Sequence, residues 1–297
     1  FYLTDNKVRV SRFEIQTKTL TMQNAEGSVI GTKQYVAGAS YVLPESKVAD
    51  FVGWEYNGAL YAAGDSIEAD GNITGKDSGN GGIVGKLMAG DIINCSYQGN
   101  VTALTSAKHQ IGGIVGEVSN GGSTIEGCTF DGAVKGACGN VGGIAGALNG
   151  GSFIKECTVT AASTIEGGTI ANNGINVGGI AGYVNNSKTG GRILNCECKG
   201  TITSHYYDAG GVAGHNRGLA IIGCTFSGTL NCDYDDSGES YASGGAGSTK
   251  YSRIGGVCGD QRGSGNIDNC IVTGTVNGKK WTGGVVGLVE AGGVNNC

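Results

Sequence analysis

Gly112-Gly113-Ile114-Val115-Gly116 is the stretch that decides the fold, because the chain repeats its pattern six more times. The pattern is a glycine pair, a β-branched residue, one further residue and a third glycine. The other copies are Gly81–Gly85, Gly142–Gly146, Gly178–Gly182, Gly210–Gly214, Gly255–Gly259 and Gly283–Gly287. Successive second glycines lie 31, 30, 36, 32, 45 and 28 residues apart. Repetition near 30 residues indicates a solenoid, in which each repeat buries its apolar face by stacking on its neighbours.

A cysteine follows each second glycine after 13 to 17 residues, with an aliphatic residue three positions before it. The pairs are Ile92/Cys95, Ile125/Cys128, Ile154/Cys157, Ile193/Cys196, Ile221/Cys224, Ile267/Cys270 and Val294/Cys297. From the cysteine onward the apolar period is two, as in Cys128, Phe130 and Val134, which places these side chains on one face of a strand. Six of the seven cysteines follow an asparagine or glycine, which tolerate left-handed backbone. We therefore predict a corner there, with aliphatic and cysteine side chains both pointing inward.

Short strands joined at corners, with no helical period, predict an all-β fold. For residues 76–297 we expect a right-handed parallel β-helix of about seven coils, and for residues 1–75 a separate module with short strands such as Thr19–Met22.

If the repeats stack in register, the seven cysteines form an inward column with neighbours about 4.8 Å apart, a geometry that does not suit a disulfide. We predict mostly free, buried thiols. The final repeat stops at Cys297, before the strand that completes the other coils, so we expect the native polypeptide to continue or to be capped there.

Composition excludes several classes of protein. The 297 residues include 59 glycines but one proline, and the glycines lack the period of three that collagen requires. A net charge of −5 with no Lys/Arg cluster argues against nucleic acid as a partner. No apolar run approaches the roughly 18 residues of a membrane span, so direct membrane insertion is not expected. The chain does not begin with Met, and we read it as a mature fragment from which any export signal has been removed.

The 45-residue interval carries the first candidate site. Its acidic residues Asp233, Asp235, Asp236 and Glu239 have carboxylate oxygens of the kind that bind Ca²⁺. Their spacing is not that of an EF-hand, and a solvated acidic loop is the alternative interpretation. Beyond this possible Ca²⁺, the sequence predicts no cofactor. Close Cys-x-x-Cys pairs, which zinc sites favour, do not occur.

The second candidate site is the mixture of titratable and aromatic residues at His205-Tyr206-Tyr207-Asp208. Together with His215 and Arg217, which we place one coil later, it has the composition of a sugar-binding site that works by stacking. An exposed loop with incidental aromatics is the alternative. Polysaccharide-cleaving enzymes need two carboxyl groups a few ångströms apart. The predicted outward positions instead carry scattered residues and no acidic column, so we predict no catalytic residue. They are Lys86, Glu117, Tyr183, His215 and Asp260.

Two family resemblances rest on these patterns. The Gly-Gly-Ile/Val-x-Gly block resembles the GLUG motif, which occurs in bacterial surface and secreted proteins, and the resemblance covers residues 81–297. Gly38–Pro44, Phe51–Tyr56 and Tyr61–Asp65 resemble the Listeria–Bacteroides repeat, a small β-grasp-like module of bacterial surface proteins such as internalins. The second resemblance implies a β-grasp-like module for residues 1–75.

These observations leave three functions open. The first is a non-catalytic structural or adhesive module of an exported bacterial cell-surface protein. The others are a carbohydrate-binding module and a polysaccharide-degrading lyase or hydrolase, because β-helices host all three. The expected partners are a protein or glycan on a host or neighbouring cell, and further domains of the same polypeptide. The expected location is extracellular or at the cell surface.

Overall fold

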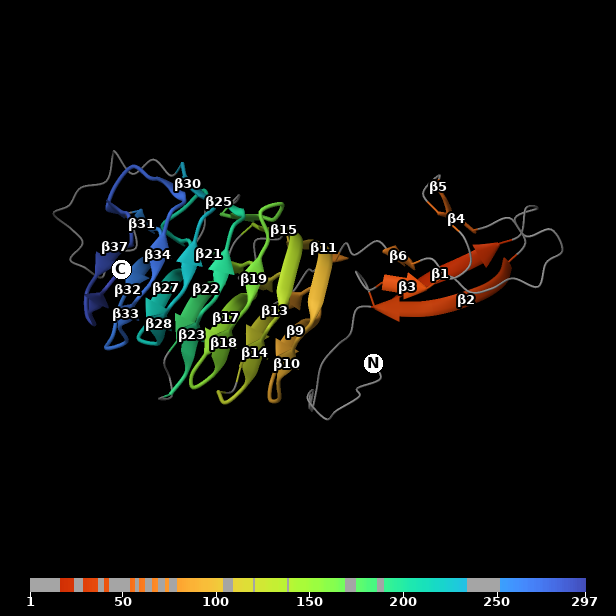
Figure 1. Ribbon diagram of the computed structural model, residues 1–297, viewed down its shortest axis with the longest axis horizontal. Coiled ribbons are helices and arrows are strands. Elements are labelled where there is room, and N and C mark those ends of the chain that lie inside the picture. The colour runs from red at the N-terminus through yellow and green to blue at the C-terminus, as the bar shows by residue number, and fades with distance from the viewer. Residues whose placement is uncertain are drawn as a thin grey trace.

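The computed structural model describes residues 17–23, 29–36, 40–42, 54–56, 59–61, 66–68, 73–74, 79–103, 109–119, 121–137, 139–168, 175–185, 190–233 and 252–297. These residues form strands and turns without a helix, and in the repeats the parallel strands stack as a β-solenoid (Figure 1). The predicted all-β solenoid is therefore confirmed. In the described part of the chain, no helix has the length and apolar character needed to cross a membrane.

The strands that precede the repeats form three antiparallel pairs. They are β1 (Thr17–Gln23) with β2 (Val29–Val36), β3 (Ser40–Val42) with β6 (Ser66–Glu68), and β4 (Trp54–Tyr56) with β5 (Ala59–Tyr61). The predicted strand at Thr19–Met22 lies within β1, whereas the β-grasp-like fold of residues 1–75 stays a prediction. β7 (Ile73–Thr74) already pairs with a solenoid strand, two residues before the predicted boundary at 75.

The repeats build four parallel sheets, which we name A to D in the order in which the chain visits them. Sheet A contains the strands that run into the glycine pairs: β8 (Asn80–Gly81), β12 (His109–Gly112), β16 (Gly139–Gly142), β21 (Asn176–Gly178), β26 (Asp208–Gly210), β31 (Arg253–Gly255) and β36 (Thr282–Gly283). Sheet B contains the strands that leave them: β9 (Val84–Leu87), β13 (Val115–Val118), β17 (Ala145–Asn149), β22 (Ala181–Asn185), β27 (Ala213–Arg217), β32 (Cys258–Gln261) and β37 (Val286–Val289).

Sheets C and D lie before and after the cysteine corner. Sheet C contains β10 (Ile92–Ile93), β14 (Thr124–Glu126), β18 (Phe153–Lys155), β23 (Arg192–Leu194), β28 (Ala220–Ile222), β33 (Ile267–Asp268) and β38 (Val294–Asn295). Sheet D contains β7, β11 (Ser96–Ala103), β15 (Thr129–Gly136), β19 (Thr158–Val159), β20 (Thr164–Gly167), β24 (Glu197–Cys198), β25 (Thr201–Ser204), β29 (Thr225–Phe226), β30 (Thr229–Cys232), β34 (Ile271–Val272) and β35 (Thr275–Asn277). From the third repeat on, two short strands replace each long strand of sheet D.

One repeat makes one coil, and equivalent residues of successive repeats lie side by side. The β-branched residue after each glycine pair donates its N–H to the carbonyl oxygen of the equivalent residue in the next coil. Ile114 N lies 3.1 Å from Ile144 O, and Ile144 N lies 3.0 Å from Ile180 O. We number the coils by their glycine motifs, so the first contains Gly81–Gly85 and the seventh contains Gly283–Gly287.

Except for Gly284 in the seventh motif, the glycines of the motifs are required because a Cβ at these positions would lie closer than 3.0 Å to a neighbouring atom. A Cβ on the first glycine, Gly112, or on the third, Gly116, would lie closer than 3.0 Å to backbone atoms of sheets A and B. A Cβ on the second, Gly113, would meet the Gly143 carbonyl and the Phe130 ring, again within 3.0 Å. The motif therefore lets sheets A and B pack backbone against backbone, which any larger residue would prevent.

The corner before each cysteine has the predicted left-handed backbone. The φ angles are 53° at Asn94, 61° at Gly127 and 50° at Asn195, and the residues on both sides of the corner are buried in the central coils. The ten cysteines that the structure describes are free thiols. The seven repeat cysteines lie in one column, of which the five central members are buried, Cys95 is half-buried and Cys297 is exposed.

The thiol column gives a first prediction. Denaturing thiol titration should find the repeat cysteines reduced, because stacked neighbours on parallel strands lack disulfide geometry. Replacing the central Cys157 with Ser should cost about 1–3 kcal/mol, because a buried hydroxyl replaces a thiol that makes weak contacts, 3.3 Å to Lys155 O and 3.7 Å to Ile125 O. Three or more disulfides among the seven cysteines would contradict the register.

A second prediction concerns Glu156, which holds the corner position of the third coil with a φ of 55°. Left-handed backbone costs a residue with a Cβ and a long side chain roughly 1–2 kcal/mol, whereas asparagine adopts it more readily. Glu156→Asn should therefore raise stability by about 1 kcal/mol, measured by chemical denaturation. The reverse change at the equivalent corner, Asn195→Glu, should lower it by a similar amount. Equal stability of both variants and the parent chain would show that the corner is not strained.

Candidate functional site

Four buried charged side chains meet between sheets A and B in the fifth and sixth coils. Asp208 on β26 and Arg253 on β31 are register partners on sheet A, each two residues before a glycine pair. His215 on β27 and Asp260 on β32 are register partners on sheet B, each one residue after a third glycine. Their exposed fractions are 2%, 2%, 7% and 0% in that order. The close approach of the two sheets brings both pairs into one cluster, which we call the charged cluster.

The ion pairs of the charged cluster connect the fifth coil to the sixth and sheet A to sheet B. The Arg253 guanidinium donates from Nε and Nη2 to the Asp208 carboxylate, at 2.5 and 3.1 Å, and its Nη1 lies 2.9 Å from Asp260 Oδ2. Nδ1 of His215 lies 3.1 Å from Asp208 Oδ2 and 3.3 Å from Asp260 Oδ2. Arg253 and His215 therefore both bridge the two carboxylates. At its outer edge, Arg262 pairs with Asp260 at 2.7 Å.

Burial and charge act in opposite directions on the titration of the charged cluster. Burial by itself would lower the pKa of His215, but the hydrogen bonds and charges of Asp208 and Asp260 outweigh it and raise that pKa above 6.5. Burial raises the pKa of Asp208 above 3.8, against the opposing effects of His215 and Arg253. For Asp260 burial is again the largest effect, yet His215 and Arg253 prevail and lower the pKa. With His215 protonated, the two carboxylates and the two cations balance.

Two buried polar atoms of the charged cluster have no hydrogen-bond partner in the structure, namely Nε2 of His215 and Oδ1 of Asp260. The Tyr183 ring covers the imidazole, with ring centroids 5.4 Å apart and planes inclined by 25°. An unsatisfied buried polar atom costs free energy, so a cluster that retains two of them is not optimised for stability alone.

Asp208, His215 and Asp260 also have the composition of a metal site, since one ligand atom of each lies within 4.8 Å of the others. However, Arg253 already bridges the two carboxylates, and Arg262 adds a second guanidinium at Asp260. A divalent cation added to these groups would leave an excess of buried positive charge. The arrangement therefore favours a proton on His215 over a metal ion.

The structure divides the predicted sugar-binding residues into separate places. Asp208 and His215 come together in the charged cluster, but they lie on consecutive strands of the same coil, not one coil apart as predicted. Arg217 ends β27 with an exposed side chain and, among the described residues, does not contact either of them. The predicted grouping is wrong because the glycine pair folds β27 back onto β26.

The other three predicted residues lie at the rim between sheets D and A. His205 stands between two carboxylates, with Nδ1 2.8 Å from Asp233 and Nε2 3.3 Å from Glu166. The rings of Tyr206 and Tyr207 are 4.1 Å apart and inclined by 62°, and the Tyr207 hydroxyl donates to that of Tyr206 at 3.3 Å. Rings at this angle do not form one flat surface, and sugar binding by these residues stays a prediction.

The predicted outward positions are not scattered. The register aligns them in one column across sheet B, listed in coil order as Lys86, Glu117, Ala147, Tyr183, His215, Asp260 and Leu288. Lys86 and Glu117 form an ion pair of 3.2 Å at one end of the column. The outward assignment is wrong for His215 and Asp260, because sheet A covers them.

Of the four predicted calcium ligands, the structure describes Asp233, whose exposed carboxylate is the partner of His205. Asp235, Asp236 and Glu239 lie outside the described residues. The Ca²⁺ site therefore stays a prediction.

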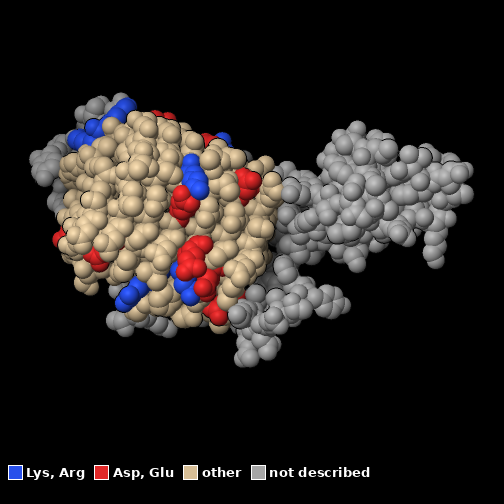
Figure 2. Space-filling model, in the orientation of Figure 1, with Lys and Arg blue, Asp and Glu red and all other residues tan. Residues whose placement is uncertain are grey.

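The surface carries small groups of mixed sign. The described part of the face in Figure 2 is largely uncharged; near its middle acidic and basic side chains lie beside one another, and a group of basic side chains lies at its upper left edge. Pairs such as Lys135–Glu166 and Lys155–Glu126, each 2.9 Å, account for part of this pattern.

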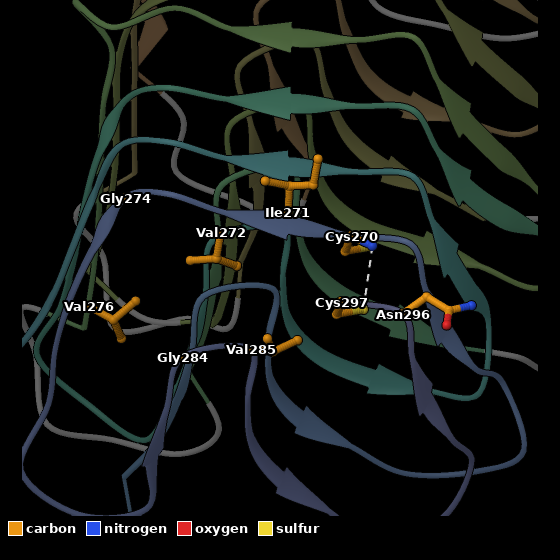
Figure 3. Close-up of a pocket in the computed structure, with 9 residues that line it drawn as sticks. All are labelled: Cys270, Ile271, Val272, Gly274, Val276, Gly284, Val285, Asn296 and Cys297. Atoms are coloured by element: carbon orange, nitrogen blue, oxygen red, sulfur yellow. Dashed lines mark hydrogen bonds between the residues drawn. The ribbon is translucent and has the colours of Figure 1, made fainter.

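An open pocket of about 570 Å³ lies above the last coil and is lined by Ile271, Val272, Cys270 and Cys297 among others (Figure 3). The backbone N–H of Cys270 lies 3.4 Å from the Cys297 sulfur. In the preceding coils this space is filled by the sheet D strand of the next coil. The pocket thus lies against the sheet D strands of the sixth coil, β34 and β35, and its lining contains no charged residue.

Comparison with known families supports the repeat assignment. The model of the GLUG motif matches residues 108–135, which contain Gly112–Gly116, the cysteine corner and most of β15. No curated protein and no solved structure matches the chain. The comparisons give no support for a Listeria–Bacteroides repeat before the solenoid. The chain therefore carries a GLUG motif, matched in its second coil, within a β-solenoid whose other coils repeat the same glycine pattern.

Proposed function

We propose that this chain is a non-catalytic structural and adhesive module of an exported bacterial cell-surface protein. The solenoid acts as a rod that displays its loops at a distance, and its partner is a protein or glycan on a host or neighbouring cell. Further domains of the same polypeptide provide attachment.

One observation carries the proposal: where acidic residues of the described coils cluster, they are paired with basic residues. His205, Glu166 and Lys135 form a chain of contacts at the rim, and the buried acids of the charged cluster are held by arginines. A glycosidase needs two carboxyl groups that face a substrate-sized space, separated by roughly 5–9 Å. The Asp208 and Asp260 carboxylates face each other through Arg253 and His215 under the cover of sheet A, where no substrate reaches them.

The experiment is a parallel assay of binding and turnover with the full chain. It is incubated with a panel of polysaccharides and peptides, products are detected by mass spectrometry, and binding is measured on glycan arrays and immobilised surface proteins. We expect binding to at least one glycan or protein without turnover. Products that disappear in Asp233→Asn or Glu166→Gln would overturn the proposal in favour of an enzyme. These two rim acids are suitable because neither is buried, so their replacement does not remove a core contact.

A further inference from the structure

The charged cluster joins the two coils on either side of the longest interval between repeats. Asp208 and His215 belong to the fifth coil, whose last strand, β30, ends at Cys232. The solenoid resumes with β31 at Arg253, whose backbone N–H donates to Tyr207 O at 2.8 Å. Arg253 and Asp260 thus belong to the sixth coil, and every ion pair between Arg253 and Asp208, or between His215 and Asp260, crosses the contact between the two coils.

We propose that the charged cluster is a proton-held joint in the rod: a protonated His215 fastens the fifth coil to the sixth, and loss of that proton loosens this one contact between coils. The joint requires no ligand other than the proton and goes beyond the display function proposed above.

The hydrogen-bond geometry requires a donor at His215 Nδ1, because two carboxylate oxygens lie within 3.3 Å of it. A carboxylate only accepts, so an imidazole with its proton on Nε2 would direct a lone pair at two anions. An imidazole with its proton on Nδ1 satisfies the geometry but leaves the buried cluster with one excess negative charge. The imidazolium ion meets both requirements.

The charge balance around His215 takes in the titratable and charged side chains of the described residues near it. Arg253 and the protonated His215 offset Asp208 and Asp260. Arg262 is offset by Glu290, whose Oε1 lies 3.5 Å from Nη2 of Arg262. The remaining neighbours are the Tyr183 ring and the Cys258 thiol, whose pKa burial raises well above 9.0, so that it stays neutral. Removing the proton from His215 therefore leaves an uncompensated buried charge at the contact between the coils.

The direction of the pH dependence follows from the raised pKa of His215. A group whose pKa is higher when the two coils are in contact stabilises that contact. For His215 this contribution is fully present below its ordinary pKa of 6.5 and is lost as the pH rises through the raised value. Asp260 acts in the opposite sense, because its pKa is lowered: its contribution is present above 3.8 and lost as the pH falls. The pKa of Asp208 is raised by burial, so its contribution, like that of His215, is lost as the pH rises, in its case from 3.8 upward. Above 6.5 the loss of the proton from His215 therefore weakens the contact between the two coils.

The test uses the full chain and two measurements. NMR titration of the His215 ring should give a midpoint above 6.5. Hydrogen exchange across the same pH range, corrected for the intrinsic pH dependence of exchange, should show progressive loss of protection in β26, β27, β31 and β32 but not in β13 and β17. Each unit by which the midpoint exceeds 6.5 corresponds to about a tenfold loss of protection.

Two variants and one additive complete the test. His215→Gln should remove the pH dependence of exchange in these four strands, whereas His205→Gln, which changes a rim histidine outside the cluster, should leave it intact. A His215 midpoint at or below 6.5 would overturn the proposal, and so would equal pH dependence in the parent chain and His215→Gln. EDTA should have no effect; if it abolished the transition, a metal ion and not a proton would hold the joint.

Discussion

Gly211→Ala should unfold the solenoid or destabilise it by more than about 3 kcal/mol, whereas Gly284→Ala should change its stability by less than about 0.5 kcal/mol. Both glycines are the second glycine of their motif. A Cβ on Gly211 would lie within 3.0 Å of the Gly256 carbonyl oxygen and of the Phe226 ring, while a Cβ on Gly284 would meet no atom within 4 Å. The difference arises because, among the described residues, none takes the place of the Gly256 carbonyl or of the Phe226 ring next to Gly284.

Thermal denaturation of the two variants measures this contrast. For a chain of this size, 3 kcal/mol corresponds to a fall in Tm of roughly 6–12 °C. If Gly211→Ala and Gly284→Ala behaved alike, Gly211 would not be in contact with the Gly256 carbonyl and the Phe226 ring, and the stacking of the fifth coil on the sixth would be wrong.

Arg253→Met should be the second most damaging substitution, with a loss of about 3–5 kcal/mol. The side chain is 2% exposed and bridges two buried carboxylates, so its removal leaves both without their main counter-ion. The measurement is the free energy of unfolding by denaturant at neutral pH.

Two comparisons isolate the charge effect. Adding Asp208→Asn to Arg253→Met should recover more than half of the loss, because the remaining Asp260 is then balanced by His215. Arg192→Met, which removes an exposed arginine from β23, should change stability by less than about 0.5 kcal/mol. If the double variant were no more stable than Arg253→Met, Arg253 would act by packing and not by charge.

The coil could be predicted from the sequence because its determinants are local and repeated. The apolar period of two after Cys128 defines the inward face of a strand, and the asparagine or glycine before six of the seven repeat cysteines marks the corner. Repetition then supplies the register, since equivalent residues stack. What the pattern did not reveal is why the motif has three glycines. That reason lies in contacts between strands of different coils, such as Gly116 against Asn80.

The charged cluster could not be found by looking for residues that are close in sequence. Asp208 and Arg253 are 45 residues apart, and the compact group at His205–Asp208 drew attention to residues that the fold separates. A signal was present, however. Asp208 and Arg253 share one repeat position, and His215 and Asp260 share another, so opposite charges occur in consecutive coils of two columns. Comparing each column for charge complementarity would have predicted both register pairs, but not their burial, which depends on the approach of sheets A and B.

The central claim is that each repeat forms one coil and stacks in register on the next. NMR detection of scalar couplings across hydrogen bonds tests it directly in the deuterated full chain. We predict couplings from the amide nitrogen of Ile83 to the carbonyl carbon of Ile114, from Ile114 to Ile144, and from Ile144 to Ile180, because these N–H groups donate across successive coils at 3.0–3.1 Å. Couplings from these amides to any other carbonyl, or couplings that pair the strands antiparallel, would contradict the solenoid.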